Sequence, residues 1–174
     1  MERDLRPEEV CILPPDHQKH ALFGPIGIEA DVVVELRTGT ADCETKGYAV
    51  TTKLLTGNEA LAWGALHAAV KVVTGYPGTP STGTLASLLA MDPPGVHVEW
   101  SVNEKVAFET AAGASWAGQR ALCTMKMSGL NVCYDSLISV AYSGARGGLV
   151  VYVADDPGVN AGMPEQDSRG FALM

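Results

Sequence analysis

The strongest constraint on the fold is a regular alternation of strand-like and helix-like segments that begins near residue 56. Short runs rich in β-branched residues alternate with runs whose apolar residues recur at helical spacing. Such a series favours parallel strands joined by helical crossovers. The prediction is an α/β fold with a doubly wound, mostly parallel sheet. We expect strands at 70–77, 96–102, 120–127 and 147–156, and helices at 56–71, 81–91, 103–118 and 130–144.

One strand-like run, LVVYV at 149–153, has no polar alternation. This pattern is typical of a strand covered on both faces of a parallel sheet. The first helix-like segment has two candidate N-caps, Thr56 and Asn58.

Residues 1–52 have a different character, with turn signals around one strand-like segment, DVVVELR at 31–37. We interpret them as an N-terminal appendage of unknown role, either a small β-rich unit or an arm. Residues 53–174 form one α/β domain in this interpretation. The series stops at GFALM inside a further helix-like segment, so we expect a fragment that is incomplete at its C-terminal end.

Charge and hydropathy exclude several classes of protein. The net charge is −8, which argues against a nucleic-acid or anionic-membrane partner. No apolar run reaches the roughly 18 residues that a membrane span needs. The first ten residues are charged, without the apolar core of a signal peptide. The four cysteines lack CxxC spacing, so we expect reduced thiols, no metal site and a cytoplasmic location.

The candidate functional residues lie in segments that follow the expected strands. Ligands of open α/β sheets bind beyond the carboxyl ends of the strands. The segments that fall there are TGYPGTPST, SVNEKVA, KMSGLN and ADDPGVN. The first places the hydroxyl of Thr79 beside Pro80 and matches neither a dinucleotide fingerprint nor a P-loop. In the third, Ser128 or Asn131 either caps the next helix or contacts a ligand, and the paired aspartates of the fourth either open a turn or order a cofactor loop.

Glu104 is the most informative of these residues, because it stands where a strand-like segment becomes a helix. A carboxylate in a first helical turn is favoured by the helix dipole alone. However, its neighbours are apolar, and a poorly solvated carboxyl group can hold or share a proton at neutral pH. The residues themselves leave both interpretations open. The apolar neighbours are Val102, Val106, Ala107 and Ala111.

Taken in order, five segments resemble the start of the larger (alpha) subunit of indolepyruvate:ferredoxin oxidoreductase, within the wider 2-oxoacid:ferredoxin oxidoreductase family. The resemblance covers about residues 53–171, and it implies a domain that binds the pyrimidine end of thiamine pyrophosphate. Met127 is a departure, because histidine is expected there in many relatives. The segments are GNEALAWGALHAAVKVVTGYPGTPST, VEWSVNEKVAFETAAGAS, TMKMSGLNV, GGLVVYVADDPG and EQDSR.

The resemblance also implies roles for individual residues. Glu104 would be the catalytic and cofactor-binding glutamate that hydrogen-bonds the pyrimidine ring nitrogen. Ser128 and Gly129 would line the pyrimidine pocket, and Thr79 and Pro80 would lie beside the substrate carboxylate. The chain has no GDG sequence and no cysteine-rich motif. Mg²⁺ and [4Fe–4S] clusters are therefore expected only from domains that this chain does not contain.

The activity implied by the resemblance is oxidative decarboxylation of a 2-oxo acid, such as indolepyruvate, to an acyl-CoA. The implied partners are the remaining thiamine-diphosphate and ferredoxin-like domains or subunits, a smaller partner subunit, ferredoxin and coenzyme A. The isolated chain is expected to be inactive. The alternatives are part of a non-oxidative thiamine-dependent decarboxylase, or a non-catalytic remnant or interaction module.

Overall fold

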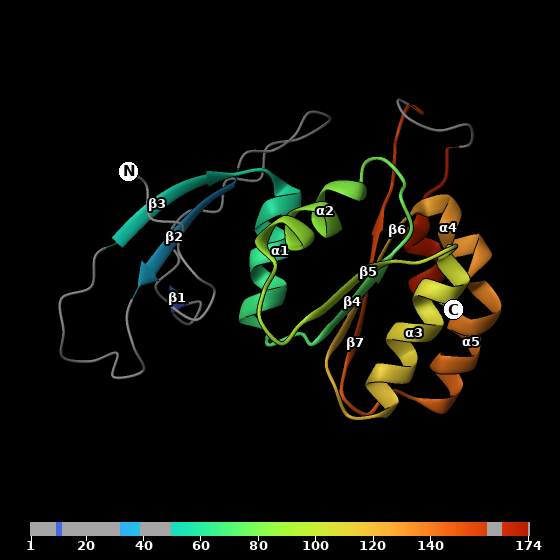
Figure 1. Ribbon diagram of the computed structural model, residues 1–174. Helices are drawn as coiled ribbons and strands as arrows, with labels where there is room; N and C mark the ends of the chain where they lie inside the picture. The colour runs from blue at the N-terminus through green and yellow to red at the C-terminus, as the bar shows by residue number, and fades with distance from the viewer. Residues whose placement is uncertain (1–9, 12–31, 39–49, 160–164, 174) are drawn as a thin grey trace. The chain divides into compact units, whose positions relative to one another are not determined.

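The computed structural model describes residues 10–11, 32–38, 50–159 and 165–173, which are drawn as coloured ribbon in Figure 1. The chain divides into two compact units, Met1–Ala68 and Ala69–Met174. The first helix of the expected α/β series, α1 (Gly57–His67), lies in the first unit, so this division falls later than the boundary that we placed between residues 52 and 53.

The first unit contains an antiparallel sheet of three strands in the order β1 (Val10–Cys11), β2 (Val32–Thr38) and β3 (Val50–Leu55). The strand expected from DVVVELR is confirmed as β2. The other residues of the predicted appendage, apart from those in β1 and β3, lie outside the described part of the chain.

Helix α1 begins at a capping box formed by two residues. The Thr56 hydroxyl accepts a hydrogen bond from the Glu59 amide at 3.3 Å, and the Glu59 carboxylate accepts one from the Thr56 amide at 2.8 Å. The backbone amides at the start of a helix have no hydrogen-bond acceptor within the helix. The capping box supplies acceptors for two of them. Of the two candidate N-caps, the structure uses Thr56.

The second unit is built on a parallel sheet of four strands in the order β5 (His97–Trp100), β4 (Val72–Gly75), β6 (Ala121–Lys126) and β7 (Leu149–Ala154). All four expected strands are therefore confirmed. The helices of this unit are α2 (Thr82–Met91), α3 (Glu104–Trp116), α4 (Met127–Val132) and α5 (Tyr134–Ser143), and a 3-10 helix spans Ser168–Leu173.

The sheet is doubly wound, as predicted. Helix α2 packs against β4, β5 and β6, whereas α3 packs against β4 and β6 together with α4 and α5. Figure 1 shows α2 on one face of the sheet and α3, α4 and α5 on the other. The connections that leave the adjacent strands β4 and β6 thus diverge to opposite faces. This divergence is the topological switch point at which open α/β sheets bind ligands.

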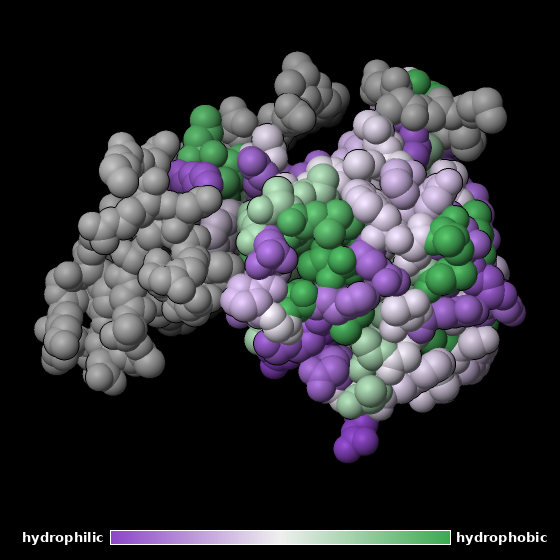
Figure 2. Space-filling model, in the orientation of Figure 1, coloured by the Kyte–Doolittle hydropathy of each residue, from purple (hydrophilic) through white to green (hydrophobic). Residues whose placement is uncertain are grey.

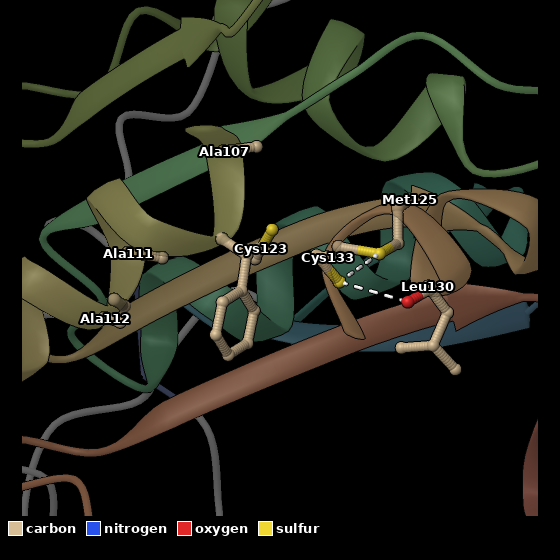
Figure 3. Packing of buried hydrophobic residues seen from close by; sticks show 9 residues of the cluster. Ala107, Ala111, Ala112, Cys123, Met125, Leu130 and Cys133 are labelled. Atoms are coloured by element: carbon tan, nitrogen blue, oxygen red, sulfur yellow. Dashed lines mark hydrogen bonds between the residues drawn. The ribbon is translucent and has the colours of Figure 1, made fainter. Parts of the chain in front are cut away.

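The core of the second unit lies between β6 and the helices α3 to α5. All six residues of β6 are buried. Helix α3 contributes Ala107, Ala111 and Ala112, whose small side chains let the helix approach the sheet closely (Figure 3). The thiol of Cys133 lies 3.6 Å from Met125 Sδ and 3.6 Å from the Leu130 carbonyl oxygen. The core is therefore sulfur-rich and closely packed.

Two cysteines in this core are free and buried, Cys123 and Cys133. Burial raises the pKa of the Cys123 thiol to about 12 and that of Cys133 to about 11. The expectation of reduced, buried thiols is confirmed for these two residues. The side chains of Cys11 and Cys43 lie outside the described residues.

Two expectations about local structure are wrong. The run LVVYV is not covered on both faces, because the side chain of Val150 in β7 is 58% exposed. The fully buried strand is β6, which lies inside the sheet. The helix expected over 130–144 is two helices, α4 and α5, which meet at Cys133. Within the described residues, no helix has the length and hydropathy needed to cross a membrane.

Candidate functional site

Glu104 is held at the carboxyl edge of the parallel sheet by the start of α3. Asn103 is the N-cap, and its side-chain oxygen accepts a hydrogen bond from the Val106 amide at 2.9 Å. The Thr74 hydroxyl of β4 donates to the Ala107 carbonyl at 2.6 Å, which ties the first turn of α3 to the sheet. Glu104 is therefore the first residue of a helix with a fixed start, and it is half-buried.

Gly129 of α4 lies against the Glu104 side chain. A β-carbon at position 129 would lie 2.7 Å from Glu104 Oε1 and 2.9 Å from Cδ, and it would also contact Cγ. Only glycine leaves room for the carboxyl group in this arrangement. The structure thus brings together two residues that the sequence singled out on separate segments. Ser128, the third residue of that set, is half-buried on the same helix.

The segment KMSGLN is not the strand-to-helix connection that we expected. Helix α4 begins at Met127, directly after β6, and its N-cap is Lys126 in an extended conformation. Of the two interpretations left open, the one in which Ser128 or Asn131 caps the next helix is wrong, because both residues lie inside α4. Strand β6 passes into α4 without a loop, so the turn-like pair Ser128-Gly129 lies inside the helix.

The loop after β4 is fixed by its own hydrogen bonds, with Gly78 at their centre. The Gly78 amide donates to Thr82 Oγ1 at 2.9 Å, and its carbonyl accepts from Ser81 Oγ at 2.7 Å. Thr79 and Pro80 lie at the tip of this loop, and both are exposed. The structure therefore places these two candidate residues on a loop that is braced by its own hydrogen bonds.

A buried ion pair joins the ends of β6 and β7. Lys126 Nζ lies 3.3 Å from Asp156 Oδ2, and both side chains are at least nine-tenths buried. A β-carbon at Gly78 would lie 2.9 Å from Lys126 Cβ, so the loop after β4 also packs against this lysine. Lys126 thus connects the segments that follow β4, β6 and β7.

Sequence reasoning missed Lys126, although a signal was present. A single lysine at the end of the otherwise uncharged run ALCTMK has to find a partner if the strand is buried, because an unpaired buried charge is very costly. The interpretation of Asp156 as a turn residue was incomplete for the same reason, since its carboxylate is buried beside the lysine.

The Glu104 carboxylate interacts electrostatically with two cysteines of the buried core. Its carboxylate adds to the effect of burial in raising the pKa of both Cys123 and Cys133. Around Glu104 the surface is partly apolar, because Trp100, Val102 and Val106 are among the exposed large hydrophobic residues. On the face seen in Figure 2, apolar residues are interspersed with hydrophilic ones over the second unit.

This arrangement suits a hydrogen bond between one carboxyl group and a ligand atom. A half-buried carboxyl group at a fixed position can donate or accept a proton when a ligand atom comes within hydrogen-bond reach. The described residues contain no group of three or more histidine, cysteine or acidic side chains that could hold a metal ion. The chemistry available here is therefore that of one positioned carboxyl group, a hydroxyl-bearing loop and a buried ion pair.

The comparisons with known proteins point to one group of enzymes. No family model matches the chain. Indolepyruvate oxidoreductase subunit IorA of Pyrococcus abyssi is 52% identical over 122 residues, which are 68% of this chain and 18% of that protein. IorA of Archaeoglobus fulgidus is 49% identical over 67% of this chain and 20% of its own length. The chain thus spans about a fifth of the length of these relatives.

More distant relatives belong to the same group. 2-Oxoglutarate synthase subunit KorA of Methanocaldococcus jannaschii is 30% identical over 70% of this chain and 33% of its own length. A solved 2-oxoglutarate:ferredoxin oxidoreductase from Magnetococcus marinus, with 2-oxoglutarate, coenzyme A and succinyl-CoA bound, has a TM-score of 0.56. It covers 66% of this chain and 20% of its own, at 22% identity, and it supports the fold alone.

Both kinds of similarity agree with the resemblance seen in the five sequence segments. The part of this chain that matches at about 50% identity therefore belongs to the family of indolepyruvate oxidoreductase subunit IorA, among the 2-oxoacid:ferredoxin oxidoreductase subunits.

Proposed function

We propose that this chain provides the pyrimidine-binding part of a thiamine pyrophosphate-dependent 2-oxoacid:ferredoxin oxidoreductase. The substrate is an aryl pyruvate such as indolepyruvate, the compound named in the relatives of about 50% identity. The single observation that carries the proposal is the geometry of Glu104, a half-buried carboxyl group that lies against Gly129 at the carboxyl edge of the sheet.

The residues present fit one end of this cofactor. Glu104 offers one carboxyl group, which suits a hydrogen bond to a single ring nitrogen of an aminopyrimidine. Gly129 leaves room for the Glu104 carboxyl group where a β-carbon would displace it, and Ser128 is the residue before this glycine on α4. The described residues hold no cluster of metal ligands. The diphosphate and its Mg²⁺ would therefore be held by another domain or subunit.

When bound, thiamine pyrophosphate supplies the electron sink for loss of CO₂ from a 2-oxo acid. In this proposal, Glu104 shares a proton with the ring nitrogen and so activates the cofactor. A positioned acid or base of this kind contributes about 10²–10⁴-fold to a rate. The exposed Thr79 hydroxyl and Pro80 would bound the substrate carboxylate on the loop after β4.

The complete reaction would be oxidative decarboxylation to an acyl-CoA, with electrons passing through [4Fe–4S] clusters to ferredoxin. Because the chain spans about a fifth of its relatives, these steps need the remaining thiamine-diphosphate and ferredoxin-like domains, a smaller partner subunit and coenzyme A. We place the complex in the cytoplasm, where buried thiols stay reduced.

The test is the substitution Glu104→Gln in an enzyme that contains this chain together with the diphosphate and cluster domains. The amide is nearly the same size, so cofactor affinity should fall little, whereas the acidic proton is lost. Turnover should fall by about 10²–10⁴-fold, and exchange of the thiazolium C2 proton for deuterium should slow in parallel.

Glu99→Gln is the matched control. Glu99 lies on β5 and hydrogen-bonds His97 Nε2 at 2.9 Å, so its replacement should change turnover by less than about threefold. Wild-type C2 exchange in Glu104→Gln with loss of exchange in Glu99→Gln would mean that the wrong carboxylate was chosen. If neither substitution matters, Glu104 is only a favourable charge at a helix start.

A further inference from the structure

The segment EQDSRGF, residues 165–171, packs against the candidate site and has no role in the function proposed so far. We call it the strap. It lies beyond the end of β7, and part of it forms the 3-10 helix that starts at Ser168. The strap is fastened at three points, through Gln166, Ser168 and Phe171.

Gln166 makes the contact that matters most for the site, because its amide bonds to α4 twice. Its Nε2 donates to the Met127 carbonyl at 3.0 Å, and its Oε1 accepts from Asn131 Nδ2 at 2.8 Å. Met127 and Asn131 are one helical turn apart, and Gly129 projects from the opposite face of the same turn. Gln166 thus holds α4 from the side that faces away from Glu104.

The other two contacts anchor the strap to the rest of the unit. The Ser168 amide donates to Asp155 Oδ2 at 3.0 Å, and Asp155 directly follows β7. The Phe171 ring meets the Tyr134 ring edge-on, with centroids 5.5 Å apart. Tyr134 is the first residue of α5. The strap therefore connects α4 to the sheet and to α5.

Helix α4 depends on such tertiary contacts. It has six residues, and its N-cap Lys126 makes no side-chain capping bond. Helices of this length are not stable in isolation, so packing and external hydrogen bonds set their position. A shift of α4 would move Gly129 relative to the Glu104 carboxyl group, since the two are in van der Waals contact.

We propose that Gln166 is a positioning residue for Glu104, acting through α4. The inference rests on the proposed function only in taking Glu104 as the catalytic group. In physical terms, the two hydrogen bonds of Gln166 hold α4 at the distance from α3 at which the Glu104 side chain adopts one orientation. Without them, α4 moves away and the carboxyl group becomes less well placed.

The first test uses Gln166→Ala in the full 174-residue chain and measures amide hydrogen exchange. Loss of the two bonds should speed exchange in α4 by about tenfold, while α2 on the opposite face stays unchanged. Asp167→Asn is the control, because Asp167 pairs with Arg169 at 2.6 Å and not with α4. Unchanged exchange in α4 would overturn the proposal.

The second test asks whether Gln166 acts on the Glu104 contact itself. Gly129→Ala puts a β-carbon against the end of the Glu104 side chain, and this clash opposes the gain in helix propensity that alanine brings. The ratio of the unfolding equilibrium constants with and without the alanine should be smaller by a factor of about three or more in the Gln166→Ala background, because a freed α4 can move away from the clash. Additive effects would show that Gln166 only fastens the strap, and the proposal would fail.

The third test uses the complete enzyme. Gln166→Ala should lower kcat and C2-proton exchange together by about tenfold and leave the KM for the 2-oxo acid within about twofold. Gln166→Glu, which keeps the acceptor for Asn131 and loses the donor to Met127, should fall between wild type and alanine. A change in KM alone would contradict positioning of Glu104.

The tests separate this inference from the proposed function. If Glu104→Gln leaves turnover unchanged while Gln166 and Gly129 remain coupled in the unfolding measurements, the proposed thiamine function is wrong, but Gln166 still positions α4 against Glu104. If Glu104→Gln abolishes turnover and the two residues are not coupled, the proposed function holds and the positioning role of Gln166 is wrong.

Discussion

Gly129 and Glu104 lie on different helices, and the absence of a side chain at Gly129 is what admits the Glu104 carboxyl group. A β-carbon on Gly129 would lie 2.7 Å from Glu104 Oε1, well inside van der Waals contact. The orientation of the candidate catalytic group is therefore set by a residue 25 positions further along the chain.

Gly129→Ala should displace the Glu104 carboxyl group and so lower turnover of the complete enzyme. The β-carbon meets the flexible end of the Glu104 side chain, so the clash should do no more than offset the roughly 0.5–1 kcal/mol that alanine gains inside a helix. Denaturant unfolding and steady-state kinetics measure the two effects.

The control is Gly113→Ala on α3, where a β-carbon meets no atom within 4 Å. This change should stabilise the helix by about 0.5–1 kcal/mol. Equal effects of the two substitutions would contradict the packing described here.

Lys126→Met should be strongly destabilising. It leaves the buried carboxylate of Asp156 without the lysine charge, and breaking a buried ion pair from one side typically costs about 3–5 kcal/mol. The double variant Lys126→Met/Asp156→Asn should recover part of that loss, because it also removes the charge that the lysine balanced. Urea unfolding of the two single variants and the double variant gives the coupling. Strict additivity would mean that the two charges do not stabilise each other.

Stability should fall with pH above about 9 because of two core thiols. Burial raises the pKa of Cys123 to about 12 and that of Cys133 to about 11, above the ordinary thiol value of 9.0. The folded state therefore binds these protons more tightly than the unfolded state does. The contribution of the protonated thiols to the free energy of unfolding is complete below pH 9. It is lost as the pH rises from 9 through the pKa values of the folded state. Each thiol adds a slope of up to about 1.4 kcal/mol per pH unit in that window.

The matched measurement is thermal or denaturant unfolding between pH 8 and 11 for the chain and for Cys123→Ala/Cys133→Ala. The variant should be less stable at pH 8 and should lose less stability on going to pH 11. Parallel pH profiles for the two proteins would show that the thiols ionise as readily in the folded state as in the unfolded one.

Deletion of residues 1–52 should leave the parallel sheet and its helices folded. The described strands of the second unit's sheet all come from residues 72–154, whereas β2 pairs with β1 and β3 in a separate sheet. Circular dichroism on heating should show one cooperative transition for residues 53–174. A protein without such a transition would show that β2 belongs to the folding unit of the α/β part.

The order of strands and helices in the second unit was predictable from sequence because each element carries its own periodicity. The sequence singled out Glu104 and Gly129 separately. Their contact could not be predicted, because it depends on how α3 and α4 pack against each other. The role of Gln166 had no sequence signal, because a polar residue in a short exposed segment has many ordinary explanations. The continuous passage from β6 into α4 was missed because glycine and serine at 128–129 are typical of turns and are tolerated in a buried helix.

The misjudged strand β7 shows a limit of pattern reading with a physical cause. An apolar run indicates a strand of a parallel sheet, but it does not show whether the strand is inside the sheet or at its edge. The same composition therefore fits the buried inner strand and an edge strand with an exposed residue such as Val150. Only the pairing of the strands distinguishes β6, which has neighbours on both sides, from β7.

The two edges of the parallel sheet are unequally protected against self-association. At one edge, β5 presents His97 and Glu99, whose polar side chains discourage a further strand from adding there. At the other edge, β7 has the uncharged sequence LVVYVA, an exposed Val150 and no partner on its outer side among the described strands. An uncharged, hydrophobic edge of this kind is a template for intermolecular strand pairing. Concentrated solutions of this chain should therefore aggregate through β7 first, and a single lysine at Val150 should be enough to suppress it.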